Sequence, residues 1–195
     1  MAPRKEKPRA WQRMLSGRRL DLLDPSPLDV EIEDIAHGLA RVARWNGQTH
    51  GPHIFSVAQH SVLVEHITIA MEAKVTPAQR LMALLHDAPE YVIGDAYKEV
   101  EARLIGAIHL RFSLPARPSP AVLRMVKGAD RAAAFFEATH LAGFAEEEAA
   151  RFFGRPDLRL RELDQLMAPM PSDRAEDLFI SRFRAIEAEM SDGPR

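Results

Sequence analysis

The sequence predicts an all-α fold, a bundle of about six to seven helices preceded by a short irregular or β-like segment. Apolar residues recur at helical spacing along most of the chain after residue 34. Pro, Gly and helix-capping residues mark the breaks between these stretches. A chain of 195 residues fits one domain. We expect a flexible basic N-terminal tail over residues 1–20 and a single helical domain over residues 21–190.

The sequence predicts a tail followed by a loop in the N-terminal part of the chain. "MAPRKEKPRAWQR" carries charge with no apolar segment behind it, so it does not resemble a secretory signal. A solvated tail is favoured over a basic arm for nucleic acid. Residues 20–34 contain Pro25 and Pro27 and a short alternation of apolar and acidic residues. That pattern predicts a loop or a short strand rather than a helix.

Helical periodicity dominates the next part of the chain. Residues 35–47 predict a short helix that ends at an Asn-Gly stop, and residues 55–72 predict a second helix around His60. Thr76 followed by Pro77 is typical of an N-cap with Pro at the first helical position. This third helix carries a run of leucines toward His86.

The second half of the domain is also helical. "LPARPSP" at 114–120 predicts a loop rather than a domain boundary, because each half alone would form a marginal core. Residues 121–142 form an apolar helix face, "EEE" at 146–148 opens another helix, and residues 174–189 form the last one. The helices after residue 145 either complete the core or form a partner surface.

Composition excludes several classes of protein. Net charge is −2, with 26 basic and 28 acidic residues, so we expect neither polymeric nucleic acid nor an anionic membrane as a partner. Cysteine is absent, which excludes disulfides and thiolate chemistry and favours a cytoplasmic location. No apolar run approaches the roughly 20 residues of a membrane-spanning helix.

One segment breaks the apolar pattern. "LMALLHDAPEYVIGD" at 81–95 places His86 and Asp87 directly after a core-like run, with Glu90 and Asp95 close behind. Burying such groups costs several kcal/mol unless a partner or a metal compensates. The segment therefore predicts a binding site.

Two further residues complete a candidate metal site. His60 and Asp130 each lie at the margin of an apolar helix face. With His86 and Asp87 they offer two imidazoles and two carboxylates, a ligand set that helical bundles build from side chains projecting inward. The alternatives are a hydrogen-bonded core histidine at His60 and a salt bridge from Asp130 to a neighbouring cation.

The ordered pattern resembles the HD-domain metal-dependent phosphohydrolases. The motifs are "AQHS", "LLHDAPE" with "GD" following, and "KGADR", and the resemblance is closest to the bacterial 5′-deoxyribonucleotidase branch, over roughly residues 35–140. It implies an HD-type helical bundle, a homodimer and a small-molecule phosphate ester as substrate. The metal ligands it implies are His60, His86, Asp87 and Asp130. It also implies nearby carboxylates at Glu90 and Asp95 and an arginine at Arg44.

These residues suit phosphoryl chemistry. A divalent ion held by imidazoles and carboxylates lowers the pKa of its water, which can then attack phosphorus. Glu90 lies one helical turn after Asp87 and is the first candidate to handle the water proton. Asp95, the other candidate catalytic residue, either assists with the same proton or holds the outer shell of the ion. Arg44 is expected to clamp the phosphate, with Arg41, one turn away, as the alternative. Secondary candidates for phosphate binding are Lys98, Lys127 and Arg131.

The number of metal ions follows from a comparison within the superfamily. Its two-metal members insert further histidines between the His-Asp pair and the last Asp, and here that interval holds only His109. We therefore expect one ion. Mixed imidazole and carboxylate ligation suits Mn, Co, Ni, Fe or Zn.

The expected function is a phosphomonoesterase acting on (deoxy)ribonucleoside 5′-monophosphates. "AYK" at 96–98 replaces the Pro-containing sequence that follows "GD" in the nucleotidases, and His50 and His53 are two extra histidines before the site. Base and sugar preference therefore stay open. One alternative is another phosphohydrolase of this superfamily, acting on a cyclic nucleotide, a guanosine polyphosphate or a non-nucleotide phosphate. The other is a non-catalytic helical binding module stabilised by its metal.

Overall fold

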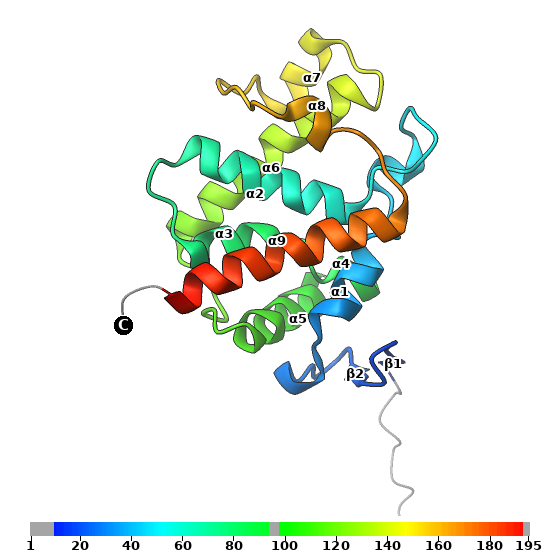
Figure 1. Cartoon of the computed structure of the whole chain (residues 1–195), viewed down its shortest axis with the longest axis vertical. Helices are drawn as coiled ribbons and strands as arrows, with labels where there is room; N and C mark the ends of the chain where they lie inside the picture. Colours follow the sequence, from blue (N-terminus) through cyan, green and yellow to red (C-terminus); the bar gives the residue numbers. More distant parts are fainter. Residues whose placement is uncertain (1–9, 94–97, 193–195) are drawn as a thin grey trace, which may run out of the picture.

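The computed structural model describes residues 10–93 and 98–192, apart from the Lys98 side chain (Figure 1). Within these ranges the helices are α1 (Ile32–Leu39), α2 (Val57–Met71), α3 (Pro77–Leu84), α4 (Glu90–Ile93), α5 (Lys98–Arg111), α6 (Pro120–His140), α7 (Glu146–Phe153), α8 (Leu163–Leu166) and α9 (Ser172–Asp192). The predicted all-α fold is confirmed. The described helices outnumber the expected six to seven because α4 and α8 have only four residues each, too short to show a periodic pattern.

A small hairpin precedes the bundle. β1 (Trp11–Arg13) pairs antiparallel with β2 (Arg19–Asp21), in the region that the sequence analysis assigned mostly to a flexible tail. Leu20 is fully buried against the core, and the Ser16 amide donates to the Asp34 carboxylate at 3.0 Å. These contacts hold residues 16 and 20 against α1 and the core.

α2 is the central helix of the bundle. It packs against α6 on one side and against α3 and α9 on the other, and Figure 1 shows α9 running across the bundle beside α3. Residues 57–65 are all buried, so this part of α2 lacks a solvent face. His60 therefore lies where the two apolar clusters of the core meet, one toward α9 and one toward α6.

Helix starts follow the capping signals in the sequence. Thr76 and Gln79 form a reciprocal capping box at α3, with N–O distances of 2.9 and 3.2 Å, as the Thr-Pro pair suggested. Ser56 caps α2 by accepting from the Gln59 amide at 3.3 Å, and Ser119 caps α6 in the same way.

The segment after α1 differs from the expected helix. α1 ends at Leu39 instead of continuing toward residue 46, and a 3₁₀ turn over Arg44–Gly47 follows. The Arg44 amide donates to the Phe55 carbonyl at 2.8 Å, so the chain pairs with the strand-like lead into α2. Trp45 and Asn46 adopt left-handed backbone angles, with φ of 55° and 50°. This turn presents Arg44 and Trp45 to α6.

A buried ion cluster ties α2 to two neighbouring helices. The Glu65 carboxylate is fully buried and accepts from Arg80 of α3 at 2.7 Å and from Arg182 of α9 at 2.7 and 2.9 Å. A buried carboxylate with these partners is a structural feature whose disruption destabilises the fold.

Gly38 sets the distance between α1 and α4. A Cβ at this position would lie 2.7 Å from the Tyr91 Cβ and 2.8 Å from the Tyr91 carbonyl oxygen. We expect Gly38→Ala to lower the free energy of unfolding by about 1–3 kcal/mol through overpacking, measured by denaturant titration. The control is Gly106→Ala in α5, where the nearest atom lies 3.7 Å away. Equal stability of the two variants would contradict the close packing of α1 on α4.

Among the helices over residues 10–93 and 98–192, none combines the length and apolarity needed to cross a membrane.

Candidate metal centre

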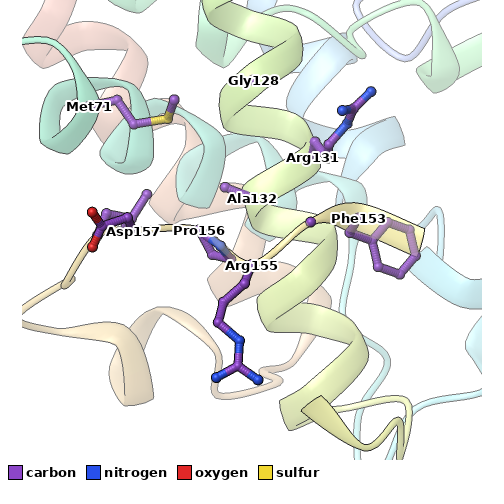
Figure 2. A pocket seen from close by; sticks show the side chains of 10 residues that line it. Met71, Gly128, Arg131, Ala132, Phe153, Arg155, Pro156 and Asp157 are labelled. Atoms are coloured by element: carbon purple, nitrogen blue, oxygen red, sulfur yellow. The ribbon is translucent and has the colours of Figure 1, made fainter. Parts of the chain in front are cut away.

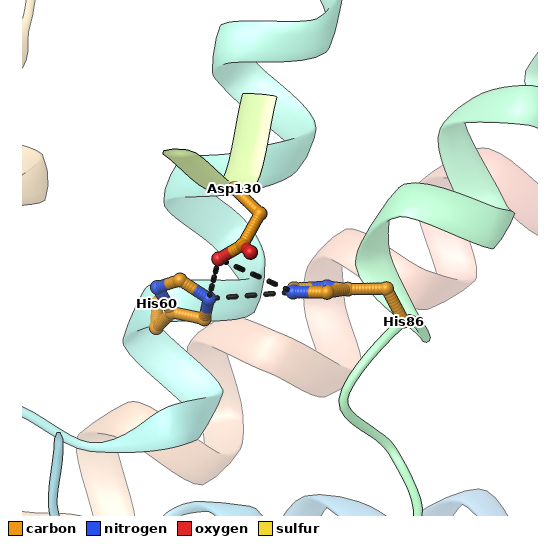
Figure 3. Close-up of side chains that lie close together, drawn as sticks. All are labelled: His60, His86 and Asp130. Atoms are coloured by element: carbon orange, nitrogen blue, oxygen red, sulfur yellow. Dashed lines mark hydrogen bonds and ion pairs between the residues drawn. The ribbon is translucent and has the colours of Figure 1, made fainter. Parts of the chain in front are cut away.

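Four predicted ligands meet at the centre of the bundle. His60 comes from α2, His86 and Asp87 from the turn after α3, and Asp130 from α6. Their ring nitrogens and carboxylate oxygens converge, as Figure 3 shows for three of them. The His60 Nε2 atom lies 3.3 Å from the His86 Nε2 atom, 3.4 Å from the Asp87 Oδ2 atom and 3.3 Å from the Asp130 Oδ1 atom. The His86 Nε2 atom lies 3.2 and 4.0 Å from the same two oxygens.

The outer nitrogens of both rings have acceptors as partners. The His60 Nδ1 atom lies 2.5 Å from the Glu137 carboxylate, and the His86 Nδ1 atom lies 2.8 Å from the Ala83 carbonyl oxygen. Because these oxygens only accept, each Nδ1 carries the proton and donates it. A neutral ring then presents a bare lone pair at Nε2. With both rings neutral, four lone-pair atoms converge, an arrangement that favours a cation among them.

The spacing of these atoms fits a metal ion. Ligands about 2.1 Å from an octahedral ion lie about 3.0 Å apart when adjacent and about 4.2 Å apart when opposite. The measured separations of 3.2–4.0 Å fall between these values. The group His60, His86 and Asp130 could thus hold a metal ion, and Asp87 lies at ligand distance from both rings.

The electrostatics of the cluster also favour a cation. Burial lowers the pKa of His60, but the Glu137 carboxylate and the two aspartates outweigh it and raise this pKa well above its ordinary value. Burial raises the pKa of Asp87, but the neighbouring imidazoles pull it well below its ordinary value. The pKa of Asp130 is lowered by the same rings against its own burial. Without a metal, a proton on His60 supplies the positive charge.

Metal and proton should therefore compete for His60. Since the pKa of His60 is raised in the metal-free protein, the ring is protonated below that pKa and must lose its proton to bind an ion. We expect the Co²⁺ association constant to fall by up to about tenfold for each pH unit below that pKa and to level off above it. Calorimetric titrations from about pH 5.5 to about pH 8 measure this. A constant affinity across the range would contradict the arrangement.

Two adjoining cavities open beside the cluster. The first has a volume of about 360 Å³ and is lined by Arg44, Asp87, Glu90, Lys127, Asp130, Arg131, Ala134 and Phe153. The second, about 470 Å³, shares four of these residues and adds an aromatic and aliphatic wall formed by Trp45, Val42 and Val57. Both volumes lie within the usual range for ligand pockets. The first cavity holds three cationic side chains next to the converging lone pairs.

Most of the predicted site residues meet here. Arg44, Glu90 and Lys127 line the same cavity as two of the ligand carboxylates. The Glu90 amide donates to the Asp87 carbonyl at 3.0 Å, which places its side chain one turn from the ligand. Asp95 lies outside the described residues, as does the Lys98 side chain, although α5 begins at Lys98.

Three residues of this region escaped the sequence analysis. Glu137 is fully buried and touches His60, Trp45 lines the second cavity, and Phe153 of α7 lines both cavities. Glu137 had a readable signal, because it lies two helical turns after Asp130 on the same helix and interrupts a run of apolar residues. The role of Phe153 depends on how α7 folds back, which local patterning does not reveal.

A smaller hollow lies next to the site mouth. It has a volume of about 180 Å³, and Figure 2 shows Arg131 and Phe153 on its wall, residues that also line the first cavity. Arg155 lines the hollow as well, but pairs with Glu146 at 3.2 Å. Arg131 is exposed and lines both the hollow and the first cavity. Its positive charge therefore lies where it can attract an anionic ligand that enters the candidate site.

Comparison with known proteins places the chain among relatives. It is 54% identical to RCAP_rcc00048, an uncharacterized protein of Rhodobacter capsulatus, over 94% of this chain and 98% of that protein. The chain belongs to the same family as RCAP_rcc00048. YfdR of Escherichia coli, also uncharacterized, is 32% identical over 112 residues, which is 52% of this chain and 56% of YfdR. No family model matches the chain. The names of these relatives state no activity, so function rests on the site itself.

Proposed function

We propose that this RCAP_rcc00048-family protein is a metal-dependent phosphohydrolase that acts as a phosphomonoesterase on nucleoside 5′-monophosphates. The observation that carries the proposal is the convergence of four lone-pair atoms beside a cavity lined by Arg44, Lys127 and Arg131. The first feature calls for a cation and the second for an anion. A phosphate ester bound next to a metal ion meets both demands.

The proposed cofactor is one divalent transition-metal ion held by His60, His86, Asp87 and Asp130. Mn, Co, Ni, Fe and Zn all suit this donor set. Bound there, such an ion would supply a water of lowered pKa and would polarise a phosphoryl oxygen.

The side chains around the ion divide the remaining tasks. Arg44 donates through Nε to Glu137 at 3.1 Å, and a guanidinium has four further N–H donors to offer to a phosphate. Lys127 and Arg131 add positive charge at the cavity wall. Glu90 lines the cavity together with two ligand carboxylates and is the proposed general base.

The open side of the cluster argues against a purely structural metal. Structural sites are closed by protein ligands, whereas catalytic sites keep positions open. Here the Asp130 side chain is 41% exposed, and both aspartates line a cavity. A module that kept a metal only for folding would have no use for the cations and the acid gathered at this opening.

The adjoining cavity favours a nucleotide over a small phosphate. Trp45, Val42 and Val57 provide an apolar and aromatic wall next to the cationic cavity, with Phe153 shared between the two. Aromatic walls accept planar groups such as nucleobases. A cyclic nucleotide or guanosine polyphosphate would also use such a wall, so these are the main alternatives within the proposal.

Phosphate release from a panel of ribo- and deoxyribonucleoside 5′-monophosphates tests the substrate class. The protein is stripped of metal and assayed before and after Mn²⁺ or Co²⁺ is restored. We expect release only after restoration, and a faster reaction with nucleotides than with glycerol phosphate. If the protein releases no phosphate from monophosphates but cleaves cyclic nucleotides or guanosine polyphosphates, the monoesterase assignment is overturned. If it cleaves none of these phosphate esters, the hydrolase assignment is overturned.

A further inference from the structure

We propose that Glu137 is a positioning residue that holds the metal ligand His60 and the phosphate-binding Arg44 in a single hydrogen-bonded unit. The inference rests on the metal centre of the proposed function. The Glu137 side chain is fully buried within α6, between the buried residues Phe136 and Ala138. A carboxylate in such surroundings is costly unless strong donors compensate.

Each oxygen of Glu137 serves a different part of the site. Oε1 accepts from the His60 Nδ1 atom at 2.5 Å. Oε2 accepts from the Arg44 Nε atom at 3.1 Å and from the Trp45 Nε1 atom at 2.9 Å. Three N–H donors thus surround this buried carboxylate and offset the cost of its burial. One carboxylate thus joins the metal side of the site to its substrate side.

The contact with His60 decides which ring nitrogen faces the metal. With its proton held on Nδ1 by Glu137, the neutral ring presents the Nε2 lone pair toward His86, Asp87 and Asp130. A carboxylate behind a metal-binding histidine also fixes the ring plane and raises its basicity. Glu137 therefore acts on the metal through His60 without touching it.

The contacts with Arg44 and Trp45 hold an unusual backbone turn. Trp45 has a φ of 55°, in the left-handed region that costs free energy for a bulky residue. Its ring is fixed by Phe144 and Phe153, with ring centroids 5.6 and 6.0 Å away, and its indole N–H by Glu137. Arg44, the residue before Trp45, is held by the same carboxylate and lines the cavity.

A glutamine at position 137 cannot reproduce this pattern. All three partners are donors, and Gln has one accepting oxygen and one donating amide. In either orientation the amide NH₂ faces a donor, His60 in one case and Arg44 with Trp45 in the other. If it faces His60, the ring must move its proton to Nε2, which blocks the metal position.

The test compares Glu137→Gln with a matched control elsewhere in the core. Glu65→Gln makes the same change in another fully buried glutamate that accepts from two arginines, Arg80 and Arg182, outside the candidate site. Co²⁺ dissociation constants of the metal-stripped proteins are measured by calorimetry, together with unfolding temperatures. With saturating Co²⁺, the dissociation constant of inorganic phosphate is also measured.

We expect Glu137→Gln to weaken Co²⁺ binding by about 10- to 100-fold and to weaken phosphate binding as well. Glu65→Gln should lower the unfolding temperature yet leave Co²⁺ affinity within about threefold of the parent. Unchanged Co²⁺ affinity in Glu137→Gln, or an equal loss in both variants, would overturn the inference. Parent protein that binds no Co²⁺ would instead overturn the proposed metal centre, so the two failures are distinguishable.

Glu137→Asp keeps the test decisive if Glu137→Gln does not fold. Aspartate retains the charge and the accepting oxygens but is one methylene shorter, so it cannot reach all three donors. We expect Co²⁺ affinity between that of the parent and that of Glu137→Gln, with a shifted visible absorption of the bound Co²⁺. A folded Glu137→Asp protein with the affinity and spectrum of the parent would overturn the inference.

Discussion

Replacing Asp130 by Ala should abolish metal binding and metal-dependent phosphate release. Asp130 supplies the oxygen 3.3 Å from the His60 Nε2 atom, and its loss leaves three of the four proposed ligands. We expect Co²⁺ affinity to fall by at least about 10²-fold and phosphate release to fall by at least about 10³-fold. Metal content after dialysis and initial rates of phosphate release measure the two effects.

The stability of the metal-free variant separates ligand loss from unfolding. The Asp130 side chain is 41% exposed, so its removal should change the unfolding temperature of the metal-free protein little. Asp177→Ala, an exposed aspartate on α9, is the control and should keep full metal content. An Asp130→Ala protein with the metal content of the parent would show that Asp130 is not a ligand.

Replacing Glu90 by Gln should separate catalysis from metal binding. Glu90 lines the cavity with Asp87 and Asp130 but is not among the four converging groups. If it takes the proton from the attacking water, Glu90→Gln should lower kcat by about 10²- to 10⁴-fold. Metal affinity should stay within a few-fold of the parent. Steady-state kinetics at saturating metal and calorimetry provide the two measurements.

The same variant distinguishes an enzyme from a metal-stabilised binding module. In a binding module, Glu90→Gln would leave the function intact, whereas loss of His86 would destabilise the fold. Glu148→Gln changes an exposed glutamate at the start of α7 and serves as the control. Equal kcat in Glu90→Gln, Glu148→Gln and the parent would rule out Glu90 as the general base.

The fold was predictable where local signals are strong. The start of α3 was readable because Thr76 and Pro77 encode a capped helix, and α6 because apolar residues recur along many turns. α4 and α8 were not readable, since one turn of helix is stabilised by its neighbours rather than by its own pattern. The hairpin was missed because Leu20 and Ser16 are held by tertiary contacts with α1 and the core.

In the candidate site, too, residues with a strong local signal were predictable and residues placed by tertiary contacts were not. His60, His86, Asp87 and Asp130 were found because ionisable residues at the edges of apolar helices are conspicuous. Phe153 was not, because it reaches the cavity through the return of α7 toward α6, a contact between helices that no local pattern specifies. The 3₁₀ turn at Arg44 was mistaken for helix, since its backbone follows a pairing with Phe55.

Metal titration of the stripped protein tests the central claim most directly. Co²⁺ is added stepwise while phosphate release from a deoxynucleoside 5′-monophosphate and bound Co²⁺ are measured on the same samples. The proposed centre predicts that release rises in proportion to bound metal and saturates at one ion per chain. Full release by the stripped protein in the presence of a chelator would contradict it.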